Sequence, residues 1–289
     1  MCLLRNEIAR RYDLSMENVF IGNGSDEVLS FCFYAFFDAV SFPELTYSFY
    51  PVYCDFYGIP YTRVPLDTDL GVNLDSFLSA PGGVIIANPN SPTGMYIDKS
   101  SIETFLRLCP PRKTIIIDEA YIEFGGETCA RLVELFDNLV VIHTFSKSHS
   151  LAGLRLGYAI ASPELIGALF SVKDSFNSYP VHTIAQDIGL SAFSDLEYTQ
   201  RIKNTIIQTR ELFSRELENL GWRICPSKAN FLLAAKPGID GREIYSELKK
   251  RGILVRYFDT EGLKGFVRIT VGTQDQMQTL IKTISNLWG

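Results

Sequence analysis

The stretch VVIHTFSKSHSLAGLR, residues 140–155, joins an apolar run to a polar loop that contains a lysine and an arginine. Its first six residues are mostly β-branched or aromatic, which predicts a strand covered on both faces. The same order of apolar run and polar segment occurs twice earlier, as VIIA (84–87) before NPNSPTG (88–94) and as TIII (114–117) before DEAY (118–121). Three such units in a row indicate a parallel sheet with its polar loops at one edge.

Outward from these units, short apolar runs alternate with helical stretches across residues 19–145, a pattern typical of βαβ units. The sequence therefore predicts an α/β fold, with a large domain over residues 1–178 that holds a mainly parallel sheet and a smaller α+β domain over residues 179–289. The other expected strands lie at 19–21, 230–234 and 266–271, and the expected helices at 25–37, 99–108, 163–175, 241–251 and 273–287, with a long helical region before Leu220.

The composition of the 289 residues, with 46% hydrophobic and 21% charged, is that of an ordinary globular protein, which excludes a disordered or fibrous chain. The longest apolar runs, such as residues 31–37, are far shorter than the roughly 20 residues that cross a bilayer. The N-terminus lacks the long apolar stretch and small-residue cleavage site of a secretory signal. We therefore expect a cytoplasmic protein without a membrane partner.

The cysteines, histidines and net charge narrow the possible partners. The six cysteines are widely spread without a CxxC pair, so we expect free thiols. The three histidines have neither HxH nor HExxH spacing, so we expect no catalytic metal. A net charge of −6 without a basic stripe argues against nucleic acid, because binding to the phosphate backbone is mainly electrostatic. Small molecules are the expected ligands.

The polar segments that follow the predicted strands carry groups with complementary chemistry. Ligands of an open parallel sheet bind outside the carboxyl ends of its strands, so these groups should face one crevice. Lys147 can form a Schiff base with an aldehyde, Asp118 can keep a pyridine nitrogen protonated, and Tyr121 can donate to an oxygen on that ring. Such a set fits a cofactor that combines an aldehyde, a pyridine ring and a phosphate.

A fourth segment, IGNGSDE (21–27), predicts the phosphate site, because it joins a strand to a helix. Gly24 lets the backbone approach a ligand, and Ser25 or Asp26 is a plausible N-cap beside free N–H groups. Thr144, Ser146 and Arg155 could complete the anion site. Each segment alone has an ordinary explanation, such as a capped turn, a salt-bridge partner or a solvated lysine. Their joint occurrence in this order favours a cofactor site.

Taken together, the motifs resemble the fold-type I pyridoxal-phosphate (PLP) aminotransferases, and most closely the histidinol-phosphate aminotransferases. The resemblance implies that Lys147 carries PLP covalently and moves the substrate proton, that Tyr47 stacks on the cofactor ring, and that Asn90 contacts the cofactor, with Ser91 as the alternative. It also implies that Arg268, assisted by Arg256, binds the substrate anion. The motifs that carry it are GNGSDE (22–27), TYSFYPVY (46–53), NPNSPTG, DEAY, TFSKSHSLAGLRLGY (144–158), SKANFLL (227–233) and VRITVGT (267–273).

The resemblance further implies transamination between histidinol phosphate and 2-oxoglutarate, in histidine biosynthesis, by a homodimer. Within the same fold the alternatives are a threonine-phosphate decarboxylase and an aminotransferase for other amino acids. A catalytically impaired PLP-fold protein is a third alternative, because the chain begins some tens of residues later than its relatives. The N-terminal arm of those relatives reaches the neighbouring subunit's site, so we expect a more open substrate entrance and weaker dimerisation.

Overall fold

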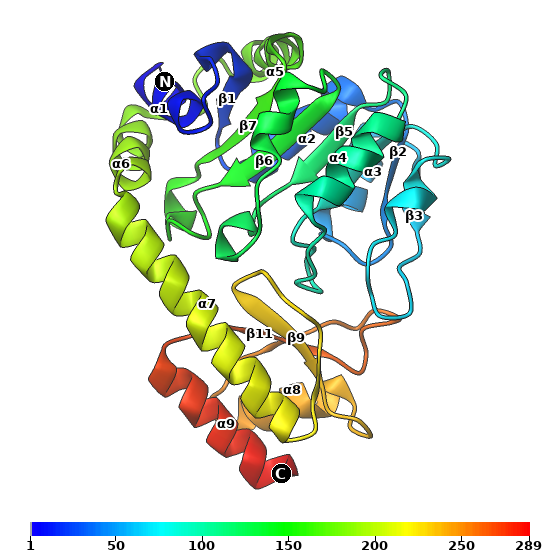
Figure 1. Cartoon of the computed structure of the whole chain (residues 1–289), viewed down its shortest axis with the longest axis vertical. Helices are drawn as coiled ribbons and strands as arrows, with labels where there is room; N and C mark the ends of the chain where they lie inside the picture. The colour runs from blue at the N-terminus through cyan, green and yellow to red at the C-terminus, as the bar shows by residue number, and fades with distance from the viewer. Residues whose placement is uncertain (1) are drawn as a thin grey trace.

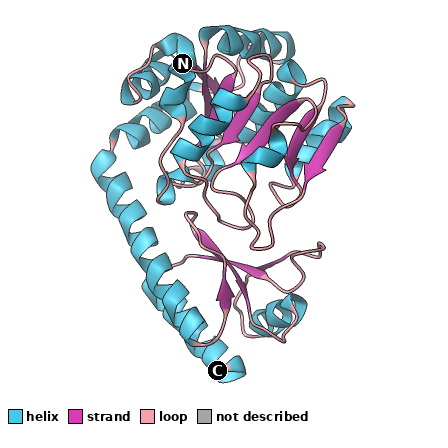
Figure 2. Cartoon of the chain, turned by 45° about the vertical axis from the view of Figure 1, so that its right-hand side comes forward, coloured by secondary structure: helices cyan, strands magenta, loops and turns pink. Residues whose placement is uncertain are grey.

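Two β-sheets organise the chain in a computed structural model, which describes residues 2–289. Figure 1 shows the larger sheet in the upper part of the molecule and the smaller one below it, with the long helix α7 (Leu196–Asn219) running beside both. The larger sheet has seven strands in the order β1-β7-β6-β5-β4-β2-β3, and the smaller has four in the order β10-β11-β9-β8. The two groups of strands are also separate in Figure 2.

The larger sheet is mainly parallel, as predicted. The pairs β3–β2, β2–β4, β4–β5 and β5–β6 are parallel, whereas β7 runs antiparallel to both β6 and β1. Its strands are β1 (Val19–Gly22), β2 (Val40–Pro43), β3 (Tyr61–Val64), β4 (Gly83–Ala87), β5 (Ile115–Asp118), β6 (Leu139–Thr144) and β7 (Gly157–Ala161).

Helices cover both faces of this sheet, because its central strands are apolar on both sides. Along β5, Ile115 and Ile117 pack into one core cluster and Ile116 into the other, as the alternation of side chains in a strand requires. The first cluster lies under α1 (Cys2–Arg11), α4 (Lys99–Leu108) and α6 (Thr183–Ser194), and the second under α2 (Ser25–Phe36), α3 (Phe49–Tyr57) and α5 (Pro163–Phe176). Short 3₁₀ helices span Met16–Asn18, Leu74–Phe77, Ile122–Phe124, Ala130–Glu134 and Ala152–Leu154.

The smaller sheet packs against three helices around a separate core that includes Phe213, Trp222 and Leu232. The sequence predicts one long helical region before Leu220, but the structure has two helices there, α6 and α7, because Asp195 between them is not helical. The Asp195 carboxylate accepts a 3.0 Å hydrogen bond from the N–H of Tyr198 and so caps α7. The remaining elements are β8 (Arg223–Ile224), β9 (Phe231–Ala235), α8 (Gly241–Lys250), β10 (Arg256–Tyr257), β11 (Val267–Thr270) and α9 (Gln274–Trp288).

Helix α6 lies after the predicted boundary at residue 178, yet Ala185 and Phe193 belong to the core of the larger sheet. The division of the chain into two domains stays a prediction, and this packing favours a boundary closer to Asp195. No helix within residues 2–289 is both long and apolar enough to cross a membrane.

Candidate active site

Asp118, the last residue of β5, is a buried carboxylate held by two donors. The Tyr50 hydroxyl donates to Oδ2 at 2.8 Å, and the N–H of Ala120 donates to Oδ1 at 3.2 Å. Burial raises the pKa of Asp118 to about 6, and the two hydrogen bonds oppose that rise. A nearby cation stabilises the charged form of a buried acid, so the position of Asp118 suits a partner such as a pyridinium nitrogen.

Asp118 lines a cavity of about 170 Å³ at the carboxyl ends of the central strands. The cavity brings together nine of the residues predicted from the sequence, although they come from four separate motifs of the chain. Those nine are Ser25, Asp26, Tyr47, Asp118, Tyr121, Thr144, Ser146, Lys147 and Arg155. The expectation that strand-end residues face one crevice therefore agrees with the geometry.

Lys147 reaches the cofactor cavity without being held by another described side chain. Its Nζ has no hydrogen-bond or ion-pair partner among residues 2–289 and lies 5.2 Å from the centre of the Tyr121 ring. The edge of the Tyr121 ring in turn contacts Phe231 of β9, with the ring centres 5.1 Å apart. The smaller sheet thus forms part of the surroundings of this lysine.

The anion end of the cavity is built where β1 turns into α2. Gly24 has φ of +89°, and a Cβ at this residue would lie 2.7 Å from Nη2 of Arg155. Val28 is the first residue whose N–H bonds back into the helix, to the carbonyl of Gly24, which leaves the N–H groups of Ser25 and Asp26 available to an anion. Arg155 Nη2 lies 3.2 Å from the Asp26 carboxylate and supplies a cation to the same place.

Each chemical group of PLP has a suitable partner among the residues of this cavity. The helix N-terminus and Arg155 suit the phosphate, Asp118 suits the ring nitrogen, and Lys147 suits the aldehyde. Tyr47 also lines the cavity, and its hydroxyl donates to Oδ1 of Asp26 at 2.9 Å, which fixes its ring beside the phosphate end.

Asn90 does not face the cavity. Its Nδ2 donates to the carbonyl of Leu45 at 2.9 Å and to Oγ1 of Thr93 at 3.1 Å, and its Oδ1 accepts from Oγ1 of Thr46 at 3.0 Å. The amide is therefore used within the protein, where it fixes the NPNSPTG turn. The cofactor contact expected of Asn90 does not fit this geometry. The alternative, Ser91, lines the cavity.

A second, outer cavity of about 530 Å³ adjoins the first and shares Tyr47, Ser91, Tyr121 and Lys147 with it. Arg256 and Arg268, the predicted substrate residues, both line it and lie opposite each other in the β10–β11 pair. The shared lysine connects the cofactor cavity with a space that presents cations to a substrate.

Arg268 is the more enclosed of these two arginines. Its guanidinium lies 4.8 Å from the centre of the Phe231 ring and 5.6 Å from that of Phe258, and its Nη1 donates to Oγ of Ser91 at 3.3 Å. Burial lowers the pKa of Arg268, with a smaller contribution from the charge of Arg256. Its buried Nε has no partner among the described residues. A guanidinium in this state favours an anionic ligand.

Sequence reasoning missed Tyr50 and a buried pair formed by Glu119 and His143. Glu119 Oε2 lies 3.1 Å from His143 Nε2, and Glu119 Oε1 accepts from the N–H of Cys129 at 2.7 Å. Because neighbours in a strand point to opposite faces, this pair lies behind Asp118 and joins the ends of β5 and β6. Glu119 stands within DEAY and Tyr50 within TYSFYPVY, so both motifs contained a signal.

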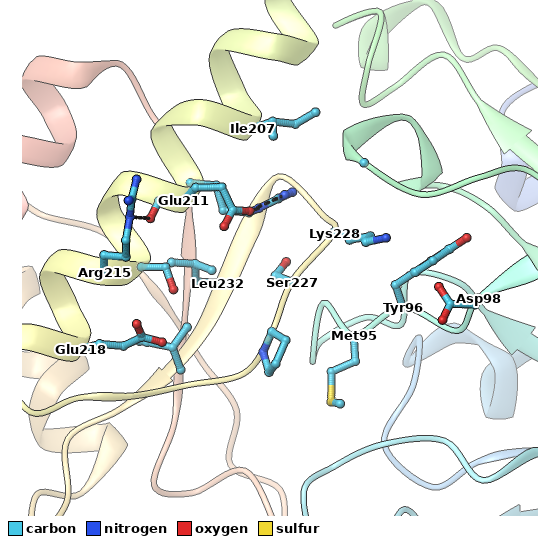
Figure 3. Close-up of a pocket in the computed structure, with 15 residues that line it drawn as sticks. Met95, Tyr96, Asp98, Ile207, Glu211, Arg215, Glu218, Ser227, Lys228 and Leu232 are labelled. Carbon is cyan, nitrogen blue, oxygen red and sulfur yellow. Dashed lines mark hydrogen bonds and ion pairs between the residues drawn. The ribbon is translucent and has the colours of Figure 1, made fainter.

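A larger cavity of about 600 Å³ lies elsewhere, between α7 and the loops that contain Met95 and Lys228 (Figure 3). Neither Lys147 nor Asp118 lines it. Arg210 of α7 donates from Nη1 to the carbonyls of Phe124 at 2.8 Å and Ala229 at 2.9 Å, and so holds the surrounding segments together. The groups that line this space have mixed charge and no arrangement that suits one chemistry.

Comparison with known proteins finds close relatives of this chain. Two curated relatives are similar over nearly the whole chain: the histidinol-phosphate aminotransferase of Syntrophus aciditrophicus (strain SB), with 50% identity over 99% of this chain and 81% of the relative, and that of Lactococcus lactis subsp. cremoris (strain SK11), with 47% identity over 96% and 79%.

Solved structures show the same fold. The histidinol-phosphate aminotransferase from Clostridium acetobutylicum has a TM-score of 0.92 at 25% identity and covers 99% of this chain and 88% of its own. The enzyme from Sinorhizobium meliloti, solved in complex with pyridoxal-5'-phosphate, has a TM-score of 0.88 at 24% identity and covers 98% and 80%. The family described as aminotransferase class I and II matches residues 3–284. The chain therefore belongs to the class I and II aminotransferases.

Proposed function

We propose that this protein transfers an amino group between histidinol phosphate and 2-oxoglutarate, forming imidazole-acetol phosphate and glutamate, as a step of histidine biosynthesis. The observation that carries the proposal is the position of Lys147, which has no side-chain partner among residues 2–289 and lines both the cavity of Asp118 and the cavity of Arg268. The curated relatives similar over nearly the whole chain bear the name of this activity, which supports the choice of substrate.

PLP, once bound, supplies an aldehyde and an electron-withdrawing ring that stabilises negative charge at the substrate's α-carbon. Lys147 would bond to that aldehyde, the Asp118 carboxylate would face the ring nitrogen and Tyr121 the ring oxygen. Tyr47 would pack against the ring. The phosphate would lie at the start of α2 against the N–H groups of Ser25 and Asp26, close to Gly24, Thr144, Ser146 and Arg155.

The residues of the chain then have distinct tasks. Lys147, released when a substrate amine replaces it, would hold the α-proton and return it at a different carbon, which makes it both base and acid. Arg268 would bind the carboxylate of glutamate and the phosphate of the other substrate, with Arg256 beside it. Phe231 and Phe258 keep water from one side of the Arg268 guanidinium, which strengthens its attraction for an anion.

We also propose that the protein acts as a homodimer. Phe49, Val52 and Phe56 lie on one face of α3 and are 46%, 47% and 78% exposed, and Tyr34 of the neighbouring α2 is 64% exposed. Such a cluster of exposed apolar side chains is typical of an interaction surface. The expected cytoplasmic location stays a prediction.

The test is a visible spectrum of the purified, PLP-loaded protein before and after addition of histidinol phosphate, followed by 2-oxoglutarate. We expect the absorbance of the lysine-bound cofactor to bleach on the first addition and to return on the second, with glutamate formed. Release of carbon dioxide from phosphorylated threonine without amino transfer would reject the proposal. Cofactor absorbance that no amino donor bleaches would instead indicate the catalytically impaired protein.

A further inference from the structure

A third arginine, Arg63, lines the outer cavity together with Arg256 and Arg268. It belongs to β3, one of the two edge strands of the larger sheet, whereas the other two lie on β10 and β11 of the smaller sheet. The cavity is therefore bordered by cations from both sheets.

Arg63 is held loosely and has no counter-charge. Its side chain is exposed, its guanidinium lies 5.7 Å from the centre of the Tyr61 ring, and it makes no ion pair within the described part of the chain. Among the described residues that line this cavity, Glu44 is the one carboxylate, and no ion pair joins it to any of the three arginines. The cavity thus carries an excess of positive charge that an anionic ligand would balance.

The two substrates of the proposed reaction differ in the anion that they bring to this space. Glutamate carries two separate carboxylates, each with a single negative charge and two acceptor oxygens, and one of them would lie against Arg268. A phosphate monoester carries close to two negative charges at neutral pH and offers three acceptor oxygens. A single enclosed arginine can satisfy the carboxylate, while the phosphate has charge and oxygen atoms left for further donors.

We propose that Arg63 is a specificity residue, which binds the phosphate of the phosphorylated donor from the side of the larger sheet and contributes little to the binding of glutamate. This inference rests on the proposed function and names a group that the sequence motifs do not include. Arg268 forms the inner contact in both half-reactions, and Arg63 adds a contact that only the phosphate uses.

The experiment compares Arg63→Gln with the unmodified protein and with Arg201→Gln as a matched control. Arg201 is likewise an exposed arginine over a tyrosine, 5.3 Å from the centre of the Tyr198 ring, but lies on α7 and does not line the outer cavity. For Arg63→Gln we expect kcat/KM for histidinol phosphate to fall about tenfold, as for loss of one partly exposed charge-assisted bond, and kcat/KM for glutamate to change less than about twofold. Arg201→Gln should match the unmodified protein in both.

Arg63→Lys should have a kcat/KM for histidinol phosphate between those of Arg63→Gln and the unmodified protein, because lysine restores the charge but cannot form a bidentate contact. An equal loss for both substrates, or no loss for either, would overturn the inference.

Binding of inorganic phosphate to the PLP-loaded protein, measured by titration calorimetry, separates this inference from the proposed function. Its dissociation constant should rise several-fold in Arg63→Gln and stay unchanged in Arg201→Gln. If the unmodified protein does not react with histidinol phosphate, the proposed function fails, while phosphate binding still decides the role of Arg63. Equal phosphate binding by Arg63→Gln and the unmodified protein would overturn it.

Discussion

The hydroxyl of Tyr50 donates a 2.8 Å hydrogen bond to Oδ2 of Asp118, and both side chains are buried. Burial by itself favours the neutral acid, whereas this hydrogen bond favours the carboxylate. Because burial raises the pKa of Asp118 to about 6, the charge that would face the cofactor depends on its two donors, of which the Tyr50 hydroxyl has the larger effect and the N–H of Ala120 the smaller.

Tyr50→Phe should make cofactor binding weaker at mildly acidic pH. Loss of the donor raises the pKa of Asp118 further, by about one pH unit if the bond to the charged group is worth about 1.5 kcal/mol. The pH below which PLP binds more weakly to the cofactor-free protein should therefore be higher in this variant. Tyr57→Phe is the control, because the Tyr57 hydroxyl pairs with Ser30 instead. If PLP affinity falls at the same pH in Tyr50→Phe as in the unmodified protein, the role assigned to Tyr50 is contradicted.

Asp118→Asn should stabilise the cofactor-free protein at neutral pH, although it removes the charge that PLP needs. The pKa of this acid is higher in the folded chain, about 6 against an ordinary value of 3.8, so its contribution to stability is complete below the lower value and is lost as pH rises through the higher one. Two pH units correspond to about 3 kcal/mol as an upper limit.

Denaturant unfolding of both cofactor-free proteins across this pH range measures the effect. The difference between them should vanish in acid and grow toward neutrality. If the asparagine variant is instead less stable at neutral pH, the hydrogen bonds to the Asp118 carboxylate offset the cost of burying its charge.

Gly24→Ala should weaken PLP binding by more than its backbone strain explains. An alanine would be strained at φ of +89°, and its Cβ would lie 2.7 Å from Nη2 of Arg155, so the guanidinium must move away from the anion site. Gly58→Ala is the matched control, since Gly58 also has positive φ, of +70°, but no atom within 4 Å of the new Cβ. Both variants should lose about 1 kcal/mol of unfolding free energy, and only Gly24→Ala should lose PLP affinity, by about tenfold. If the two variants bind PLP with equal affinity, Gly24 is not part of the phosphate site.

The parts of the fold that could be predicted are those whose signal is local. The apolar runs that became β4, β5 and β6 are buried on both faces, so sequence and structure agree to within about two residues. β2, β3 and β7 were not predicted, because β2 ends in a proline, β3 has a single buried residue and β7 begins with a glycine directly after a polar loop. The antiparallel direction of β7 depends on its partners in the sheet, which the sequence of the strand does not encode.

The site shows the same division. Lys147, Asp118 and Arg155 follow strands or turns directly, so their position at the sheet edge could be inferred from the sequence. The choice between Asn90 and Ser91 could not be inferred, because the Asn90 amide is hydrogen-bonded to Leu45 and Thr46, which belong to a different loop. Contacts between segments distant in sequence decide such directions.

Lys147→Ala should abolish both the visible absorbance of the lysine-bound cofactor and turnover. Without the amine no covalent link can form, and loss of the proton-transferring group alone should lower kcat by about 10³-fold. PLP should still bind through the groups around its phosphate and ring, with lower affinity. Lys228→Ala is the control, because Nζ of Lys228 lies 4.1 Å from the Tyr96 ring in the separate cavity of Figure 3.

A small primary amine supplied in solution should restore part of the proton transfer to Lys147→Ala, while leaving Lys228→Ala unchanged. Such rescue would distinguish loss of the reacting group from misfolding, since an unfolded site gains nothing from an added amine. Retention of the cofactor absorbance in Lys147→Ala would mean that a different amine carries PLP. The arrangement of Asp118, Tyr121 and Arg155 around the cavity would then have to serve another reaction.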